Sequence, residues 1–318
     1  MKIAIVGAGP VGVGMAVVFA RAGHQIAIYE SSVEARQPAL GEIQAVLRLL
    51  DEAGLLVEPP DVIFSRIGLA DELEEAVDDV AHVQECATEN LEAKRQLFRR
   101  IDGLLDLSAT IATSSSSMTT TMIASEVEGR TRCLTAHPAN PPYLLPVIEL
   151  GVAEFTSEEA LTRVFDLVTD AGMTPVTILS EIPGLAYNRL QGALLREAYC
   201  LVRDGIVSAT DLDTLVRDGL GRRWAVIGPF ATADLNTRGG IVAHAQRLGP
   251  AYLSMGKERG QVDPWTPDLV ERVASELRER LPSDSWDINR RIRDQALARI
   301  VRALADTSLP GVIDPRTM

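Results

Sequence analysis

The first thirty residues alternate between short apolar runs and a glycine-rich turn. KIAIV at residues 2 to 6 is apolar, GAGPVG at 7 to 12 is the turn, and an apolar helical stretch follows up to Gly23. HQIAIYE at 24 to 30 is a second short run of the same kind. Short apolar runs bounded by turn residues are typical of buried strands, and the stretch between them has the length of a helix. The pattern predicts a strand-helix-strand unit.

Further β-like runs follow, with helical stretches between several of them. Strands that alternate with helices form parallel sheets covered by helices, so this part of the chain predicts an α/β fold with a Rossmann-type, mostly parallel sheet up to about residue 182. The runs are DVIFSRI (61–67), DVAHVQEC (79–86), LSATIAT (107–113), TRCLTAH (131–137) and PVTILS (175–180).

After residue 183 the periodicity is helical, as in the stretches 185–205 and 268–281, and no convincing strand follows. A length of 318 residues is long for a single hydrophobic core. We therefore predict a Rossmann-type domain over residues 1–183 and an all-helical C-terminal domain over 184–318, joined at EIPG (181–184).

Three glycines and an acid carry the prediction of the cofactor. Gly7, Gly9 and Gly12 form G-x-G-x-x-G directly after a strand and at the start of a helix, where such a turn can hold a pyrophosphate. Glu30 ends the second strand, where a carboxylate can accept hydrogen bonds from ribose hydroxyls and repels a 2'-phosphate. The four residues predict NAD rather than NADP, with FAD as a minor alternative.

Charge and cysteine content narrow the class of protein. The net charge of -13 disfavours a nucleic-acid or anionic-membrane surface. The three cysteines are odd in number and are not spaced as metal ligands, so we expect neither a disulfide framework nor a metal site. The N-terminus lacks the features of a signal peptide, and no run of eighteen apolar residues occurs. A cytoplasmic enzyme without membrane or nucleic-acid partners fits this composition.

One histidine and one acid stand out in TAHPANPPYLLPVIEL, residues 135 to 150. His137 lies at the edge of a proline run, and Glu149 lies among aliphatic residues where a buried strand is expected. A carboxylate that holds one ring nitrogen turns a neutral imidazole into a directed general base. The alternative is a turn histidine packed against prolines and an unrelated strand-end acid, because the spacing alone does not establish contact.

Long motifs resemble a known family. TSSSS at 113 to 117, AHPANPPYLLPVIEL at 136 to 150 and GLAYNRLQGALLREAYCLVRDGIVS at 184 to 208 are similar to the 3-hydroxyacyl-CoA dehydrogenase superfamily. The pattern HPxNPPYxxPxxEL and the segment DGLGRRWAVIGPF at 218 to 230 resemble its lambda-crystallin and L-gulonate 3-dehydrogenase branch. The resemblance extends to about residue 260 and implies a dehydrogenase with NAD as cofactor.

The resemblance also implies roles for single residues. His137 would be the general base that removes the hydroxyl proton, and Glu149 the acid that orients and charges it. Ser116 and Asn188 would bind the oxygen that becomes a carbonyl, with either neighbouring serine as the alternative to Ser116. Oxidation should then be favoured as the pH rises, since the base must be neutral to accept the proton.

Two charged residues in ENLEAKRQLF, residues 89 to 98, fall where the family contacts the nicotinamide-side ribose. The resemblance assigns this contact to Glu89 and Lys94. The alternative is an exposed acid and base on the surface of a helix.

Acyl-CoA enzymes of the superfamily carry a lysine-rich helical hairpin after the second strand, which can receive the phosphates of CoA. Residues 31 to 66 of this chain contain no lysine, so a free L-3-hydroxy acid, similar to L-gulonate, is the expected substrate. Its carboxylate needs a fixed cation. The resemblance implies Arg223 for this role, because the lambda-crystallin branch keeps an arginine in GLGRRWAVIGPF, with Asn236 as a weaker polar contact. The alternative is that Arg222 and Arg223 are only charges at a helix end. The cations present between 31 and 66 are Arg36, Arg48 and Arg66.

Three other functions stay open. A short-chain L-3-hydroxyacyl-CoA dehydrogenase and an L-carnitine dehydrogenase would use the same site on other substrates. A crystallin-like structural or binding protein would keep the fold without turnover. Such a protein is free to lose catalytic residues, whereas this chain has the full set of Ser116, His137, Glu149 and Asn188. The resemblance further implies a homodimer that forms through the helical domain.

Overall fold

The computed structural model describes the chain except for residues 226–227, 239, 260–267, 269–281 and 306–318. Its described residues divide into two compact units, one made of residues 1–189 and 293–305, and one made of those between 190 and 292. The helical stretch expected over 268–281 lies outside the described residues, except for Asp268. The predicted division at 183/184 stays a prediction.

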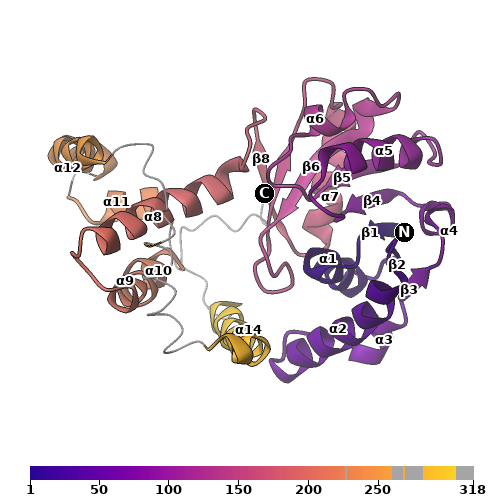
Figure 1. The fold of residues 1–318 in the computed structure, drawn as a ribbon, viewed down its shortest axis with the longest axis horizontal. Helices are drawn as coiled ribbons and strands as arrows, with labels where there is room; N and C mark the ends of the chain where they lie inside the picture. The colour runs from indigo at the N-terminus through magenta and orange to yellow at the C-terminus, as the bar shows by residue number, and fades with distance from the viewer. Residues whose placement is uncertain (226–227, 239, 260–267, 269–281, 306–318) are drawn as a thin grey trace. The chain divides into compact units, whose positions relative to one another are not determined.

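An eight-stranded sheet forms the centre of the first unit (Figure 1). The strand order is β3-β2-β1-β4-β5-β6-β7-β8. The first six strands in sequence are parallel, β7 is antiparallel to β6, and β8 is parallel to β7. The predicted mostly parallel sheet is therefore confirmed. The strands are β1 (Lys2–Val6), β2 (Gln25–Tyr29), β3 (Ile67–Ala70), β4 (His82–Glu85), β5 (Thr110–Thr113), β6 (Cys133–Pro138), β7 (Val147–Gly151) and β8 (Thr174–Ile178).

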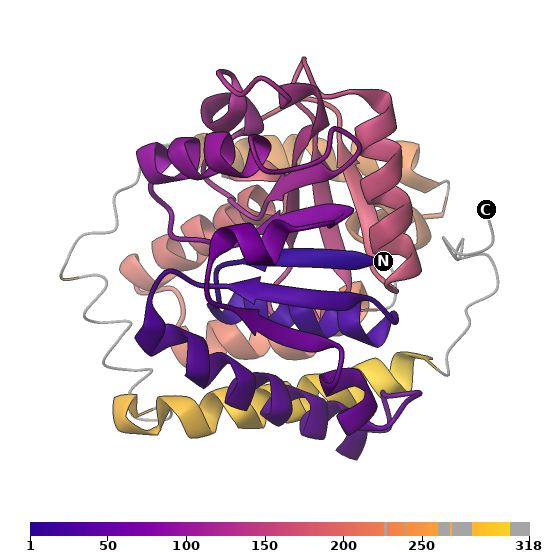
Figure 2. The same ribbon diagram turned by 90° about the vertical axis from the view of Figure 1, so that its right-hand side faces the viewer.

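Helices cover both faces of this sheet, as Figure 2 shows from the side. Successive side chains of a strand point to opposite faces, so Ile3 and Ile5 enter one apolar cluster and Ala4 and Val6 enter the other. A sheet buried on both faces explains why its strands are apolar runs rather than alternating ones. The first cluster includes side chains of α1 (Pro10–Arg21), α2 (Val33–Glu52) and α7 (Glu158–Asp170), and the second those of α4 (Leu73–Val77), α5 (Leu91–Asp102) and α6 (Thr120–Ala124).

The strand predicted over residues 61–67 is wrong. This segment forms the short helix α3 (Pro60–Phe64), and β3 begins only at Ile67. Pro60 occupies the first helical turn, where its fixed φ suits a helix and its missing N–H removes no hydrogen bond. The apolar residues of the segment therefore reach the core from a helix, and Ile63 is 1% exposed.

The helix α14 (Trp286–Ala305) returns to the first unit. Ala298 is 1% exposed within the first apolar cluster, and the Tyr143 hydroxyl donates to Asp294 Oδ2 over 3.2 Å. Tyr143 belongs to the proline-rich loop between β6 and β7, so a helix far along the sequence helps to fix that loop.

The second unit is helical throughout its described residues. The ion pairs of Arg259 with Glu197 and Asp204 join its helices. None of the described helices is both long enough and apolar enough to cross a membrane. Its described elements are α8 (Leu185–Arg203), which begins in the first unit, α9 (Ala209–Leu215), a π-helical turn at Val216–Leu220, α10 (Gly221–Trp224), α11 (Pro229–Leu235), α12 (Gly240–Glu258), a 3-10 turn at Ser283–Ser285 and the start of α14.

The turn between β1 and α1 depends on two glycines in different ways. A Cβ atom on Gly12 would lie 1.9 Å from the Gly7 carbonyl oxygen, so α1 can approach β1 this closely only without a side chain there. A Cβ atom on Gly9, by contrast, would meet no protein atom within 4 Å. Gly12 therefore serves the packing of the helix, whereas Gly9 keeps open the space above the helix start.

Gly12→Ala should lower the free energy of unfolding by about 2 kcal/mol, because α1 must move away from β1. Gly9→Ala should leave it nearly unchanged and instead weaken NAD binding, because its methyl group enters the space predicted for the pyrophosphate. Urea unfolding and calorimetric titration with NAD measure the two effects. Equal loss of stability in both variants would contradict this division of roles.

Candidate active site

The glycine turn leads to a cleft at the carboxyl ends of β1, β2 and β4. Gly7 has φ +111° and lies against the Cys86 carbonyl, so only glycine fits the turn. Gly9 is the N-cap of α1, a helix of 12 residues whose first N–H groups attract an anionic phosphate. A cleft of about 270 Å³ adjoins the turn, and its lining includes Gly7, Tyr29, Glu30 and Lys94. These residues fit the adenosine and pyrophosphate of a dinucleotide.

Glu30 lies at the end of β2, beside this cleft. Its Oε2 accepts from the Ala8 amide over 3.0 Å, and its Oε1 accepts from the Ser32 amide over 3.1 Å and the Ser31 hydroxyl over 3.2 Å. Burial by itself raises the pKa of Glu30, but these hydrogen bonds outweigh it and hold the pKa below its ordinary value. The carboxylate is therefore ionised at neutral pH, as the predicted contact with ribose hydroxyls requires.

The strand pair β6·β7 brings the predicted histidine and acid together. His137 and Glu149 are directly opposite each other in the antiparallel register. The distance from His137 Nδ1 to Glu149 Oε2 is 3.0 Å, and both side chains are largely shielded from solvent, with 12% and 3% exposed. The sheet thus places in contact two side chains that are twelve positions apart in the sequence.

The second oxygen of Glu149 holds the start of α8. Its Oε1 accepts from the Ala186 amide over 2.7 Å and from the Tyr187 amide over 2.9 Å. A carboxylate is favourable at a helix N-terminus, where amides lack partners within the helix. Asn188 follows in the same turn and is half-buried. Glu149 therefore places the predicted residue Asn188 at the same end of the sheet as His137.

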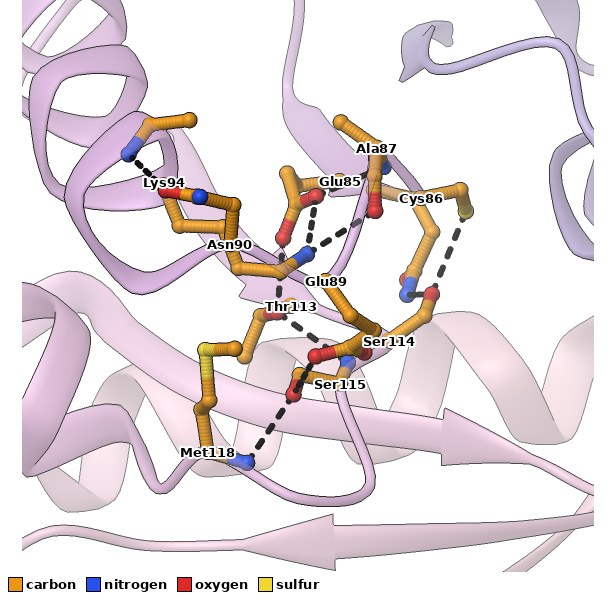
Figure 3. Close-up of polar contacts among 12 residues, drawn as sticks. Glu85, Cys86, Ala87, Glu89, Asn90, Lys94, Thr113, Ser114, Ser115 and Met118 are labelled. Atoms are coloured by element: carbon orange, nitrogen blue, oxygen red, sulfur yellow. Dashed lines mark hydrogen bonds and ion pairs between the residues drawn. The ribbon is translucent and has the colours of Figure 1, made fainter.

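The serine run forms the turn after β5, and its hydroxyls have different partners (Figure 3). Ser114 accepts from Gln84 and contacts Cys86, whereas Ser115 and Ser117 both donate to Glu89.

Within the part of the chain that the structure describes, the Ser116 hydroxyl makes no hydrogen bond, and its predicted contact with substrate stays a prediction. The Ser116 carbonyl accepts from the Gly184 amide over 2.8 Å, so the serine turn is tied to the residue before α8.

Lys94, predicted to contact the ribose, forms a buried ion pair with Glu85 instead of presenting a free ammonium. Its Nζ lies 2.6 Å from Glu85 Oε1 and donates to the Ala87 carbonyl over 3.1 Å. Glu85 also accepts from the Ala87 amide and the Thr113 hydroxyl. Figure 3 shows this group gathered between α5 and the ends of β4 and β5. The ion pair fixes the loop after β4, and the ribose contact of Lys94 stays a prediction.

The sequence reasoning missed Glu85 and its neighbour Gln84, which are both fully buried in β4. A signal was available, because HVQE places three polar side chains in a strand that the sheet buries on both faces. Buried polar side chains need hydrogen-bond partners, so such a strand predicts a polar network.

Arg223 and Asn236 belong to the second unit. Arg223 is exposed on α10, while its neighbour Arg222 pairs with Asp218 over 2.9 Å. Asn236 is the C-cap of α11 and is exposed. Their predicted contacts with substrate stay predictions.

Comparison with known proteins places these features in a family. The family model of the NAD-binding domain of 3-hydroxyacyl-CoA dehydrogenase matches residues 2–182, and that of its C-terminal domain matches residues 184–279. Lambda-crystallin of Oryctolagus cuniculus is 35% identical over 306 residues, covering 94% of this chain and 95% of the relative. L-carnitine dehydrogenase of Streptomyces coelicolor is 32% identical over 277 residues, covering 87% and 83%.

A solved structure, that of 5-formyl-3-hydroxy-2-methylpyridine 4-carboxylic acid 5-dehydrogenase, superposes with a TM-score of 0.83 at 27% identity. The superposition covers 96% of this chain and 99% of that one. The matches span both parts of the chain, from the glycine turn that fits a dinucleotide to the helices after Gly184. The chain belongs to the 3-hydroxyacyl-CoA dehydrogenase family, whose members are NAD-dependent oxidoreductases acting on CH–OH groups.

Proposed function

We propose that the protein oxidises the 3-hydroxyl of a small, free L-3-hydroxy acid, similar to L-gulonate, with His137 as the general base. The observation that carries the proposal is the contact between His137 and the buried Glu149. A carboxylate accepts only, so Nδ1 must carry the ring proton and Nε2 keeps the lone pair. That nitrogen can take the hydroxyl proton of a substrate.

Glu149 acts through His137 and does not itself remove the proton. When the imidazole becomes a cation, the carboxylate behind it stabilises the charge and keeps the ring in one orientation. The two α8 amides hold the carboxylate in place, which limits how far the pair can drift. Ser116 and Asn188 donate to the substrate oxygen before and after oxidation. Bound NAD supplies the acceptor for the hydride.

The preference for a free acid over a CoA thioester is supported by two of the three arginines between residues 31 and 66, Arg36 and Arg66. Arg36 pairs with Asp71 over 2.8 Å, and Arg66 pairs with Glu58 over 2.6 Å, so both guanidiniums are already engaged by carboxylates. An additional phosphate would have to compete with these ion pairs. For the carboxylate of a free acid, we assign Arg223 as the partner.

We also infer a homodimer that forms through the helical unit. Large apolar side chains are exposed along α8, among them Leu190 (69%), Leu194 (36%) and Leu195 (38%). Exposed apolar surface of this kind is typical of an interface. Sedimentation velocity at micromolar concentration should show about twice the monomer mass, and a single monomeric species would refute the inference.

His137→Gln should lower kcat for oxidation by about 10²- to 10⁴-fold, because the general base is lost while the cofactor site is untouched. The rise of the oxidation rate with pH should disappear in the same variant. His24→Gln is the matched control. His24 lies between α1 and β2, next to the N-terminal end of β2, whereas the cofactor cleft lies at the carboxyl ends of the strands. Full turnover by a His137→Gln protein that binds NAD normally would exclude His137 as the base.

Four substrates can be compared by the kcat/KM of NAD reduction: L-gulonate, 3-hydroxybutyrate, L-carnitine and 3-hydroxybutyryl-CoA. We expect the highest value with L-gulonate. Arg223→Met should raise KM for free acids by about 10-fold, the loss expected for one charge-assisted hydrogen bond. Arg222→Met is the control, because Arg222 already pairs with Asp218. Preference for the CoA thioester or for carnitine would replace the proposed substrate, and lack of turnover with all four would favour a binding or structural role.

A further inference from the structure

The polar residues on the α1 face of β4 form a chain of hydrogen bonds that the mechanism above does not use. His82 is 1% exposed and Gln84 is 0% exposed. Gln84 Nε2 lies 2.9 Å from the Ala136 carbonyl and 2.7 Å from Ser114 Oγ. On the other side, Gln84 Oε1 lies 3.2 Å from His82 Nε2, and His82 Nδ1 lies 2.8 Å from the Thr110 hydroxyl.

The direction of these bonds follows from one fixed acceptor. The Ala136 carbonyl can only accept, so the amide group of Gln84 must point its NH₂ toward β6 and its oxygen toward His82. His82 Nε2 then donates to that oxygen, and its Nδ1 accepts from Thr110. Burial lowers the pKa of His82 to about 4, which keeps the ring neutral and able to fill both roles at neutral pH.

Gln84 reaches β6 across an intervening strand. In the register of the sheet, Gln84 is opposite Ala112 of β5, whose small side chain leaves room on that face. β5 pairs with β6 only up to Thr135. The Ala136 carbonyl, one residue further, accepts a hydrogen bond from the Gln84 side chain in place of a strand amide. A buried carbonyl without a partner would be unfavourable, and Gln84 supplies the donor.

That carbonyl belongs to the peptide unit that joins Ala136 to His137. Side chains alternate along a strand, so the His137 ring projects to the face opposite the one from which Gln84 approaches. The same NH₂ group also holds Ser114, two residues before Ser116. Gln84 thus connects the backbone of the proposed base to the start of the serine turn without lying on the substrate side of His137.

We propose that Gln84 is a positioning residue, which fixes the His137 peptide and the serine turn relative to each other through its two hydrogen bonds. The proposal rests on the proposed role of His137 as base. Catalysis of this kind is sensitive to displacements of about 1 Å, so loss of the connection should affect turnover more than binding.

Gln84→Met keeps the length of the side chain and removes both donors. The expected result is a kcat about 10- to 100-fold below that of the unchanged protein, with the NAD dissociation constant and KM within about 3-fold. Thr120→Val is the matched control: it removes the buried hydrogen bond between the Thr120 and Thr135 hydroxyls beside the same strand β6. Its kcat, measured where both variants are fully folded, should stay within about 2-fold.

Gln84→Glu is a second variant, for the case that Gln84→Met does not fold. Its side chain has nearly the same shape as that of glutamine. It replaces an NH₂ group that makes two hydrogen bonds by a carboxyl group that has at most one proton to donate, so at least one of the two bonds is lost and kcat should also fall. Turnover at the level of the unchanged protein in either folded variant would overturn the proposal. The His137→Gln variant separates the two hypotheses: if it keeps full turnover, the proposed base is wrong, and if it loses turnover while Gln84→Met does not, only the positioning role is wrong.

Discussion

The carboxylate of Glu149 is the contact on which the arrangement of the site depends. One oxygen accepts the His137 ring proton, and the other accepts two amides at the start of α8. A single buried side chain therefore sets the orientation of His137, the proposed base, and fixes the start of the helix that carries Asn188. Because an unpaired buried carboxylate is costly, all three donors are held in place together. The geometry is built into the fold before any substrate arrives.

Strand β4 adds a second constraint from the centre of the sheet. Its side chains alternate between faces, and each face carries a polar network. On the α5 face, Glu85 pairs with Lys94 and holds the loop after β4. On the α1 face, Gln84 reaches the peptide before His137 and the start of the serine turn. Both networks reach the carboxyl ends of the parallel strands, where ligands of open α/β sheets bind, through Glu85 on one face and Gln84 with Ser114 on the other.

Much of this could be predicted along the chain. The glycine turn, Glu30, the parallel sheet and the helical character of the later residues follow from local patterns, since burial on both faces demands apolar runs and a phosphate turn demands glycine. The segment 61–67 was misread, because its apolar residues suit a strand as well as a short helix and only Pro60 distinguishes the two. The ion pair of Lys94 with Glu85 could not be predicted, because nothing local shows that Glu85 lies within reach of the Lys94 ammonium.

The sequence by itself determined the class of fold and the dinucleotide turn, and it singled out His137 and Glu149 as a candidate pair. It could not decide that they touch, because a separation of twelve positions in the sequence allows many distances in space. The antiparallel register of β6 and β7 decided this, by placing His137 directly opposite Glu149. Tertiary structure likewise decided the partners of Gln84, Lys94 and Tyr143, whose contacts are up to 151 residues away in sequence. Such pairings depend on strand order and helix packing, which no local pattern encodes.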